Sequence, residues 1–274
     1  CGLKIYVSAM YGPLRVADWA LLDAHVATWP ADRPIAVHAE GGLLPRMLEL
    51  GERYGRHIHV AHVALREEIE AIIEAKHRGA RVSCEVTPHH LWLSTEDQPR
   101  LGPFGDVRPR IASPDDRAAL WQHLDAVDCV ATDHAPHTVA EKRGKEPPPG
   151  LPGLQTMLPL LLTAVDDGRL TLERLVELTV DNPRRLFGIP AQEGTSVEVE
   201  IGPRYTLSNE EQLTKCGWTP FAGMEVAGRV LRTVLRGTTV WDGSRVLAEP
   251  GSGQVLWGPA HAESKGGKSG KRRT

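Results

Sequence analysis

Short apolar runs alternate with longer segments of helical periodicity over the first 190 residues of the chain. Each run is typical of a buried strand, and three of the five end in an ionisable residue; the runs cover residues 2–7, 35–38, 57–62, 81–86 and 129–133. Apolar residues at intervals of three or four lie between them and predict helices over 16–28, 43–54, 66–78 and 114–124. This alternation favours a parallel sheet covered by helices, and therefore an α/β fold.

Such a sheet either closes into a (β/α)8 barrel or stays open and doubly wound. No glycine-rich phosphate-binding turn follows the first strand, so the sequence gives no support to an open nucleotide-binding sheet. A closed barrel needs eight strands, and five strand patterns are present. The chain also begins with Cys1 inside a strand pattern. We therefore expect a TIM-like barrel that lacks about three N-terminal βα units.

The periodicity changes near residue 190. A Pro- and Gly-rich loop at 139–153 is followed by helical patterns at 156–166 and 172–180, and Asn182-Pro183 is predicted to end the second helix. Alternating positions from about residue 196 predict a small antiparallel β-module. We expect a partial barrel over 1–190, the β-module over 191–250, and a polar, basic tail or linker over 251–274.

Composition narrows the class of protein. The 274 residues are 41% hydrophobic and carry a formal net charge of −3, which argues against nucleic acid or a membrane surface as a general partner. The four cysteines form no CxxC pair, as expected of reduced thiols in a cytoplasmic protein. No apolar run reaches the roughly 18 residues that a membrane-spanning helix needs.

Candidate chemistry lies at the ends of the predicted strands. His38, His62 and Asp133 end three of them, and two imidazoles with a carboxylate at one barrel mouth suit zinc. Lys4 lies within the apolar first run. It either reaches water from an edge strand or holds a neutral amine that carbon dioxide can carbamylate into a bridge between two metals.

The segment Ala131–His137 (ATDHAPH), with Lys142 beyond it, resembles a signature of the dihydroorotases, members of the amidohydrolase superfamily. The segments GLKIY, AVHAE, HVAHVA, CEVTPHH, PPPGLPGLQTMLPLLLTAV and NPRRLFGIP resemble the same family in the same order. The resemblance covers about residues 1–250 and is strongest to the dihydroorotase domain of the animal CAD multienzyme.

The resemblance implies a role for each matching residue. Lys4 corresponds to the carboxylated lysine that bridges two zinc ions, and His38 and His62 to ligands of one of them. Asp133 corresponds to a ligand of the other zinc and to the general base or acid at the amide nitrogen. Glu85 corresponds to a residue that can hold a further metal.

The implied reaction is the reversible cyclisation of N-carbamoyl-L-aspartate to dihydroorotate in pyrimidine biosynthesis. Arg108 and His137 are similar to the residues that hold the substrate carboxylate, a task that suits a guanidinium fork. The resemblance also implies fusion to carbamoyl-phosphate synthetase and aspartate carbamoyltransferase domains, and a homo-oligomer.

Three departures from the family pattern affect this interpretation. No HxH metal motif precedes Lys4, so the chain as given is expected to be a poor enzyme. Met10 and Tyr11 stand where the animal proteins carry a Thr and a Phe in a mobile lid, so Tyr11 is the expected aromatic cover of the substrate. Ala61 replaces a Cys, which weakens the case for a third metal.

Two alternatives remain open. A dihydropyrimidinase-like amidohydrolase would accept an uncharged ring and would not need Arg108 together with His137. A non-catalytic homologue would serve as a scaffold, which the missing HxH favours and the six retained site residues oppose.

Overall fold

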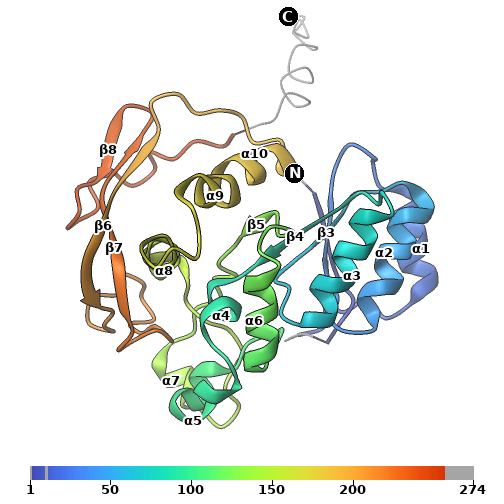
Figure 1. The fold of residues 1–274 in the computed structure, drawn as a ribbon, viewed down its shortest axis with the longest axis horizontal. Coiled ribbons are helices and arrows are strands. Elements are labelled where there is room, and N and C mark those ends of the chain that lie inside the picture. Colours follow the sequence, from blue (N-terminus) through green and yellow to red (C-terminus); the bar gives the residue numbers. More distant parts are fainter. Residues whose placement is uncertain (1, 10–11, 257–274) are drawn as a thin grey trace, which may run out of the picture.

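A parallel sheet of five strands in the order β1-β2-β3-β4-β5 forms one part of the fold (Figure 1). The computed structural model describes residues 2–9 and 12–256. Each strand pairs with the next one along the chain, as expected when a helix returns the chain between parallel strands. The strands are β1 (Leu3–Tyr6), β2 (Ile35–His38), β3 (Ile58–Val60), β4 (Val82–Val86) and β5 (Cys129–Val130).

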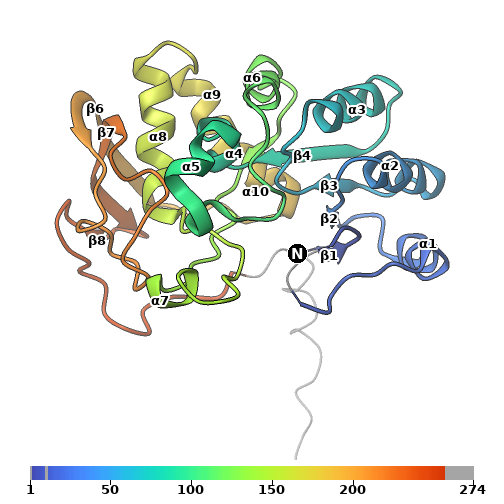
Figure 2. The same ribbon diagram turned by 90° about the horizontal axis from the view of Figure 1, so that it is seen from below.

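Helices α1, α2 and α3 cover one face of this sheet (Figure 2). In β2, Ile35 and Val37 are fully buried in the core beneath the helices. Because side chains alternate along a strand, Ala36 and His38 project towards the opposite face. The connecting helices are α1 (Trp19–Thr28), α2 (Leu43–Tyr54), α3 (Arg66–His77) and α6 (Pro114–Gln122), and the shorter ones are α4 (Pro88–Trp92), α5 (Gln98–Leu101) and α7 (Val139–Lys142).

A second, antiparallel sheet confirms the predicted β-module. It contains β6 (Ser196–Thr206), β7 (Glu225–Leu235) and β8 (Thr238–Trp241) in that order. Strand β6 stays one strand along its length, because the register shifts within it let the chain bend without leaving the sheet.

Four further helical segments follow α7 in the sequence before the second sheet begins. They are α8 (Leu154–Asp166), α9 (Leu172–Val176), the π-helical turn η3 (Glu177–Asp181) and α10 (Asn182–Phe187). The prediction that Asn182-Pro183 ends a helix was wrong, since these residues begin α10. Proline is tolerated in the first turn of a helix, where its missing N–H costs no hydrogen bond. No helix among the described residues is long and apolar enough to cross a membrane.

Helix α8 and strand β7 pack so closely that only glycine fits at one contact. The hydroxyl of Thr163 accepts a hydrogen bond of 2.9 Å from the backbone N–H of Ala227. A Cβ added at the next residue, Gly228, would overlap the side chain of Leu162. The helix therefore seats directly on the backbone of the β-module.

We expect Gly228→Ala to lower the free energy of unfolding by about 1–3 kcal/mol, because Leu162 is fully buried and has little room to move. Urea denaturation measures the change. Gly253→Ala is the matched control, since a Cβ there meets nothing within 4 Å. Equal unfolding energies for the two variants would show that the contact relaxes freely.

Candidate active site

Six side chains that the sequence singles out come together in one pocket of about 280 Å³, called here the inner pocket. Because parallel strands end at the same rim, residues far apart in the sequence converge there. Lys4 lies on β1, His38 ends β2, and His62 and Asp133 follow β3 and β5. The six are Lys4, His38, His62, Arg108, Asp133 and His137.

The backbone is strained at two of these strand ends. His62 has φ 42° and Asp133 has φ 44°, both in the left-handed region that non-glycine residues rarely adopt. Such strain gathers at functional sites, where the surrounding structure holds it in place. Strand β5 itself ends at Val130, before the predicted run 129–133 does.

His38 and His62 face each other through ring nitrogens. Nδ1 of His38 lies 2.9 Å from Nε2 of His62, and both residues are buried. The other nitrogen of His38, Nε2, lies 2.9 Å from the carboxylate of Glu40. Burial, with the nearby charges of Lys4, His38 and His90, holds the pKa of His62 well below its usual value, so this imidazole is neutral.

The histidine pair fits a metal of the zinc type. If Glu40 accepts the Nε2 proton of His38, then Nδ1 of His38 carries a lone pair that faces His62. Nδ1 of His62 is buried and has no hydrogen-bond partner among the described residues. Neutral imidazoles are zinc ligands, and a carboxylate on the far nitrogen of a ligand histidine fixes its tautomer. Among the described residues, no three His, Cys, Asp or Glu side chains gather as a metal site, so the donor set is partial.

Lys4 and Asp133 bring opposite charges to the inner pocket. Strand β1 is an edge strand and Lys4 remains accessible to water, yet the protein around its ammonium lowers its pKa, while the charges of Glu85 and Asp133 raise it. Burial raises the pKa of the half-buried Asp133, and the charge of Lys4 lowers it. Both shifts bring the neutral and charged forms closer in energy, which suits groups that exchange protons.

Arg108 and His137 lie on loops at the opposite wall. One terminal guanidinium nitrogen of Arg108 donates to the carboxylate of Asp106 and, at 2.8 Å, to the carbonyl of Val107. The other terminal nitrogen has no hydrogen-bond partner among the described residues. The backbone carbonyl of His137 accepts a hydrogen bond of 2.7 Å from the indole of Trp218. Trp218 thus ties the β-module to the pocket wall.

Comparison with known proteins finds relatives by sequence and by structure. No protein-family model matches it. It is 47% identical to "Multifunctional protein CAD" of Squalus acanthias over 92% of this chain and 11% of that protein. It is 33% identical to "Dihydroorotase" of Pyrococcus furiosus over 88% of this chain and 58% of that protein. The chain therefore spans only part of the curated relatives that it matches.

Two solved structures share the fold. L-hydantoinase (dihydropyrimidinase) from Arthrobacter aurescens matches with a TM-score of 0.86 at 28% identity, over 92% of this chain and 67% of that one. The inactive dihydroorotase-like domain of the Chaetomium thermophilum CAD-like multifunctional protein matches with a TM-score of 0.75 at 30% identity, over 91% and 69%.

The chain belongs to the dihydroorotase family of amidohydrolases. This confirms the resemblance and the expected fold, in which the five parallel strands are part of a TIM-like barrel and the antiparallel sheet lies beside it. Dihydroorotases and hydantoinases are metal-dependent families, generally with zinc.

Two residues expected from the dihydroorotase pattern lie apart from the inner pocket or outside the described residues. Glu85 does not line the pocket; its carboxylate pairs with Nε2 of His59 at 3.1 Å, so its role as a further metal ligand stays a prediction. Tyr11 lies outside the described residues. The pocket instead contains Tyr6, which sequence analysis missed, with its ring centroid 5.3 Å from the Lys4 ammonium nitrogen.

Lys142, the last residue of the dihydroorotase signature, is fully buried beside the pocket. Its ammonium donates to the carbonyls of Asp106 at 3.3 Å, Pro148 at 2.9 Å and Gly150 at 3.3 Å. These three acceptors match the three donors of an ammonium group. Lys142 thus joins the loop that carries Arg108 to the loop that lines the pocket with Gly150.

His90 supports the Arg108 loop from the other side. Its Nε2 lies 3.2 Å from the carbonyl of Pro109, and its Nδ1 lies 2.8 Å from the hydroxyl of Thr87. Burial lowers the pKa of His90 to about 4, so the ring is neutral near pH 7. These hydrogen bonds make His90 a support of the loop that carries Arg108.

The opposite wall is shaped by a close backbone approach. Gly150 has φ 139°, and a Cβ there would lie 2.5 Å from the carbonyl oxygen of Ala135 and 3.2 Å from the ring of His137. Glycine is therefore required for the 148–150 loop to pass beside the signature segment.

We expect Lys142→Met to lower the free energy of unfolding by about 2–4 kcal/mol, because it leaves the buried carbonyls of Pro148 and Gly150 without a donor at little change in volume. Urea denaturation measures the effect. Lys145→Met, at an exposed position on the same loop, is the matched control and should change stability by less than about 0.5 kcal/mol. If Lys142→Met were as stable as the control, water would have to satisfy the carbonyls.

Proposed function

We propose that the chain forms part of a dihydroorotase that interconverts N-carbamoyl-L-aspartate and dihydroorotate. The observation that carries the proposal is the gathering of Lys4, the facing pair His38 and His62, and Asp133 in one pocket with Arg108. The first four suit amide chemistry assisted by metal ions. Arg108 supplies a cation for the carboxylate that remains on the substrate in both directions of the reaction.

The substrate carboxylate is proposed to bind between Arg108 and His137. Asp106 and the Val107 carbonyl occupy one terminal nitrogen of Arg108, which holds the guanidinium in one orientation and leaves the other terminal nitrogen to donate. Fixing the carboxylate at this wall places the ureido group and the second carboxyl towards Asp133. Orientation of this kind reduces the entropic cost of ring closure.

Asp133 is proposed as the proton shuttle. In ring closure, the ureido nitrogen attacks the side-chain carboxyl carbon, Asp133 takes the proton from that nitrogen, and water leaves from the carbon. In ring opening, water adds to the ring carbonyl and Asp133 returns the proton to the departing nitrogen. The raised pKa of Asp133 in this setting narrows the energy difference between its two protonation states.

Two zinc ions are proposed as cofactors, with His38 and His62 as ligands of one and Asp133 as a ligand of the other. Lys4, carboxylated by carbon dioxide, is proposed to bridge them. When bound, such metals polarise the carbonyl and lower the pKa of a water molecule to near neutrality. Glu40, through its contact with Nε2 of His38, keeps Nδ1 available as the ligand atom.

The remaining ligands are proposed to come from an HxH segment that the sequence before Lys4 does not contain. The HIH at 57–59 is a poor substitute. His57 and His59 both contact the hydroxyl of Ser83, and neither lines the inner pocket.

The relatives that are multifunctional proteins support a fused, multidomain context. We propose that the neighbours are carbamoyl-phosphate synthetase and aspartate carbamoyltransferase domains, and that the whole protein is a cytoplasmic homo-oligomer. The function of an inactive scaffold is the second candidate, favoured by the likeness to the inactive domain of the Chaetomium protein. The retained pocket residues favour catalysis.

Asp133→Asn should abolish both ring closure and ring opening, with a loss of at least 10²-fold in kcat, because the amide cannot shuttle a proton. Substrate binding through Arg108 should persist. A spectrophotometric assay of dihydroorotate, in the protein that carries the HxH strand, measures kcat, and calorimetry measures binding. Activity within a few-fold of the parent protein would exclude Asp133 as the shuttle.

Metal analysis provides a second test. With an HxH strand present, we expect about two zinc ions per chain, and fewer in a variant with His62→Ala. His57→Ala is the control and should keep the zinc content of the parent. One zinc or none in the complete protein would contradict the binuclear site. Turnover of dihydrouracil in preference to dihydroorotate would favour the dihydropyrimidinase alternative.

A further inference from the structure

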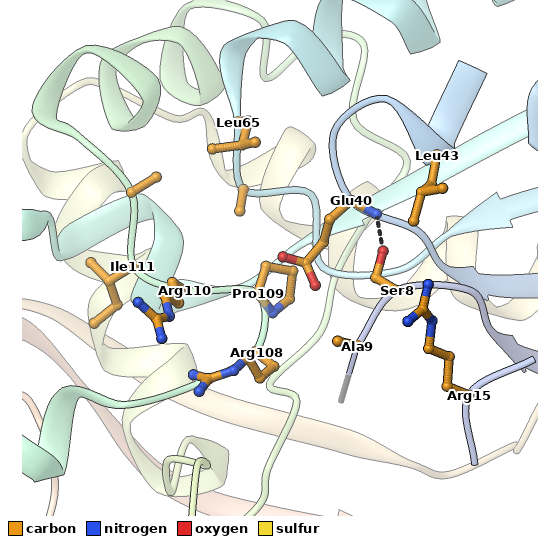
Figure 3. Close-up of a pocket in the computed structure, with 12 residues that line it drawn as sticks. Ser8, Ala9, Arg15, Glu40, Leu43, Leu65, Arg108, Pro109, Arg110 and Ile111 are labelled. Carbon is orange, nitrogen blue, oxygen red and sulfur yellow. Dashed lines mark hydrogen bonds between the residues drawn. The ribbon is translucent and has the colours of Figure 1, made fainter. Parts of the chain in front are cut away.

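A second pocket of about 440 Å³ lies next to the inner pocket and is called here the outer pocket (Figure 3). The segment after β1, the end of β2, the turn after β3 and the loop 108–112 form its walls. Arg108 lines both pockets, so the two pockets meet at this residue. A molecule in the outer pocket is therefore next to the group assigned to the substrate carboxylate.

The outer pocket carries an excess of positive charge. Its lining contains Arg15, Arg108 and Arg110, and one carboxylate, Glu40. In Figure 3, Arg108 and Arg110 come from one wall, Arg15 comes from the other, and Glu40 lies between the walls. With three cationic side chains against one acidic side chain, the pocket attracts anions.

Two of the guanidinium groups have no acidic partner within the described residues. Nε of Arg15 donates to the carbonyl of Val7 at 3.1 Å, which fixes the stem and leaves the two terminal nitrogens free. Arg110 is exposed and makes no side-chain hydrogen bond or ion pair to any described residue. Arg108, in contrast, already pairs with Asp106.

Glu40 does not neutralise these cations. Its Oε1 lies 2.9 Å from Nε2 of His38, and its backbone N–H donates to the hydroxyl of the buried Ser8 at 2.6 Å. Both contacts hold the carboxylate at the His38 side of the pocket. Arg15 and Arg110 are therefore available to a ligand from outside the chain.

We propose that the outer pocket is an anion-binding site that takes a small carboxylate substrate before it passes to Arg108. This proposal rests on the proposed function and names the residues that capture its substrate, Arg15 and Arg110. Free guanidinium forks match the geometry of carboxylates. A cationic cleft raises the local concentration of an anionic substrate, and it can raise the association rate by about 10-fold or more at low ionic strength.

The first test uses the complete, metal-loaded protein that includes an HxH strand. In Arg110→Gln and in the double variant with Arg15→Gln, kcat/KM for N-carbamoyl-aspartate should fall about tenfold at low salt, with kcat unchanged. The dependence of kcat/KM on ionic strength should also become flatter. Arg245→Gln removes the same charge from the turn after β8 and should change neither quantity.

The outcomes separate this proposal from the proposed function. If Arg108→Gln abolishes capture while the Arg15 and Arg110 variants keep the parent's kcat/KM and salt dependence, the outer site is overturned and the function stands. If Arg108→Gln also has no effect, the proposed function fails. A fall in kcat with unchanged salt dependence would likewise overturn the outer site.

The second test needs no turnover and identifies the anion. Calorimetry with succinate and with inorganic phosphate, on the chain without added metal, should show succinate binding that weakens about tenfold in the Arg15 and Arg110 double variant. Binding of phosphate alone would overturn the assignment to a carboxylate and indicate a phosphate site. Binding of neither anion at millimolar concentration would overturn the proposal.

Discussion

The carboxyl ends of the five parallel strands meet at one rim, and the groups that the proposed chemistry needs, apart from Lys4 within β1, either end those strands or lie in the loops beyond them. This constraint brings Lys4 and Asp133 together across more than 120 residues of sequence. It has a local cost, because the chain must turn away from the strand within a residue. That cost is the strain of the left-handed backbone at His62 and Asp133, which are both proposed metal ligands.

Because several ionisable groups lie at this rim, the pKa of each one depends on its neighbours. Surrounding protein lowers the pKa of Lys4 and of His62 and raises that of Asp133, while the charges of Lys4 and Asp133 act on each other in the opposite sense. The loop that carries Arg108 is held in place by neighbouring side chains. Lys142 and His90 fix the two sides of the Arg108 loop through backbone carbonyls, so the position of the guanidinium depends on side chains that never reach the pocket.

Local periodicity predicted the regular elements well, since the bounds expected for β2 and α2 are those observed. The ionisable residues chosen because they end predicted strands also share a pocket in the folded chain. Burial and hydrogen bonds that depend on contacts between residues distant in the sequence were not predicted. A Pro- and Gly-rich loop gives no sign that Lys142 is fully buried beneath it. Similarly, only the folded chain brings Trp218 of the β-module to the carbonyl of His137.

The order of the sheet sets the spacing of the site in a way that no single contact does. Strands β1 and β5 are its two edges, and a flat sheet would hold them roughly 19 Å apart, at about 4.8 Å per strand. Lys4 and the residue that follows β5, Asp133, nevertheless line one pocket, so the sheet must curl. Their separation is therefore a measure of that curvature. The curvature of the strands between the two edges therefore sets the distance between these two opposite charges.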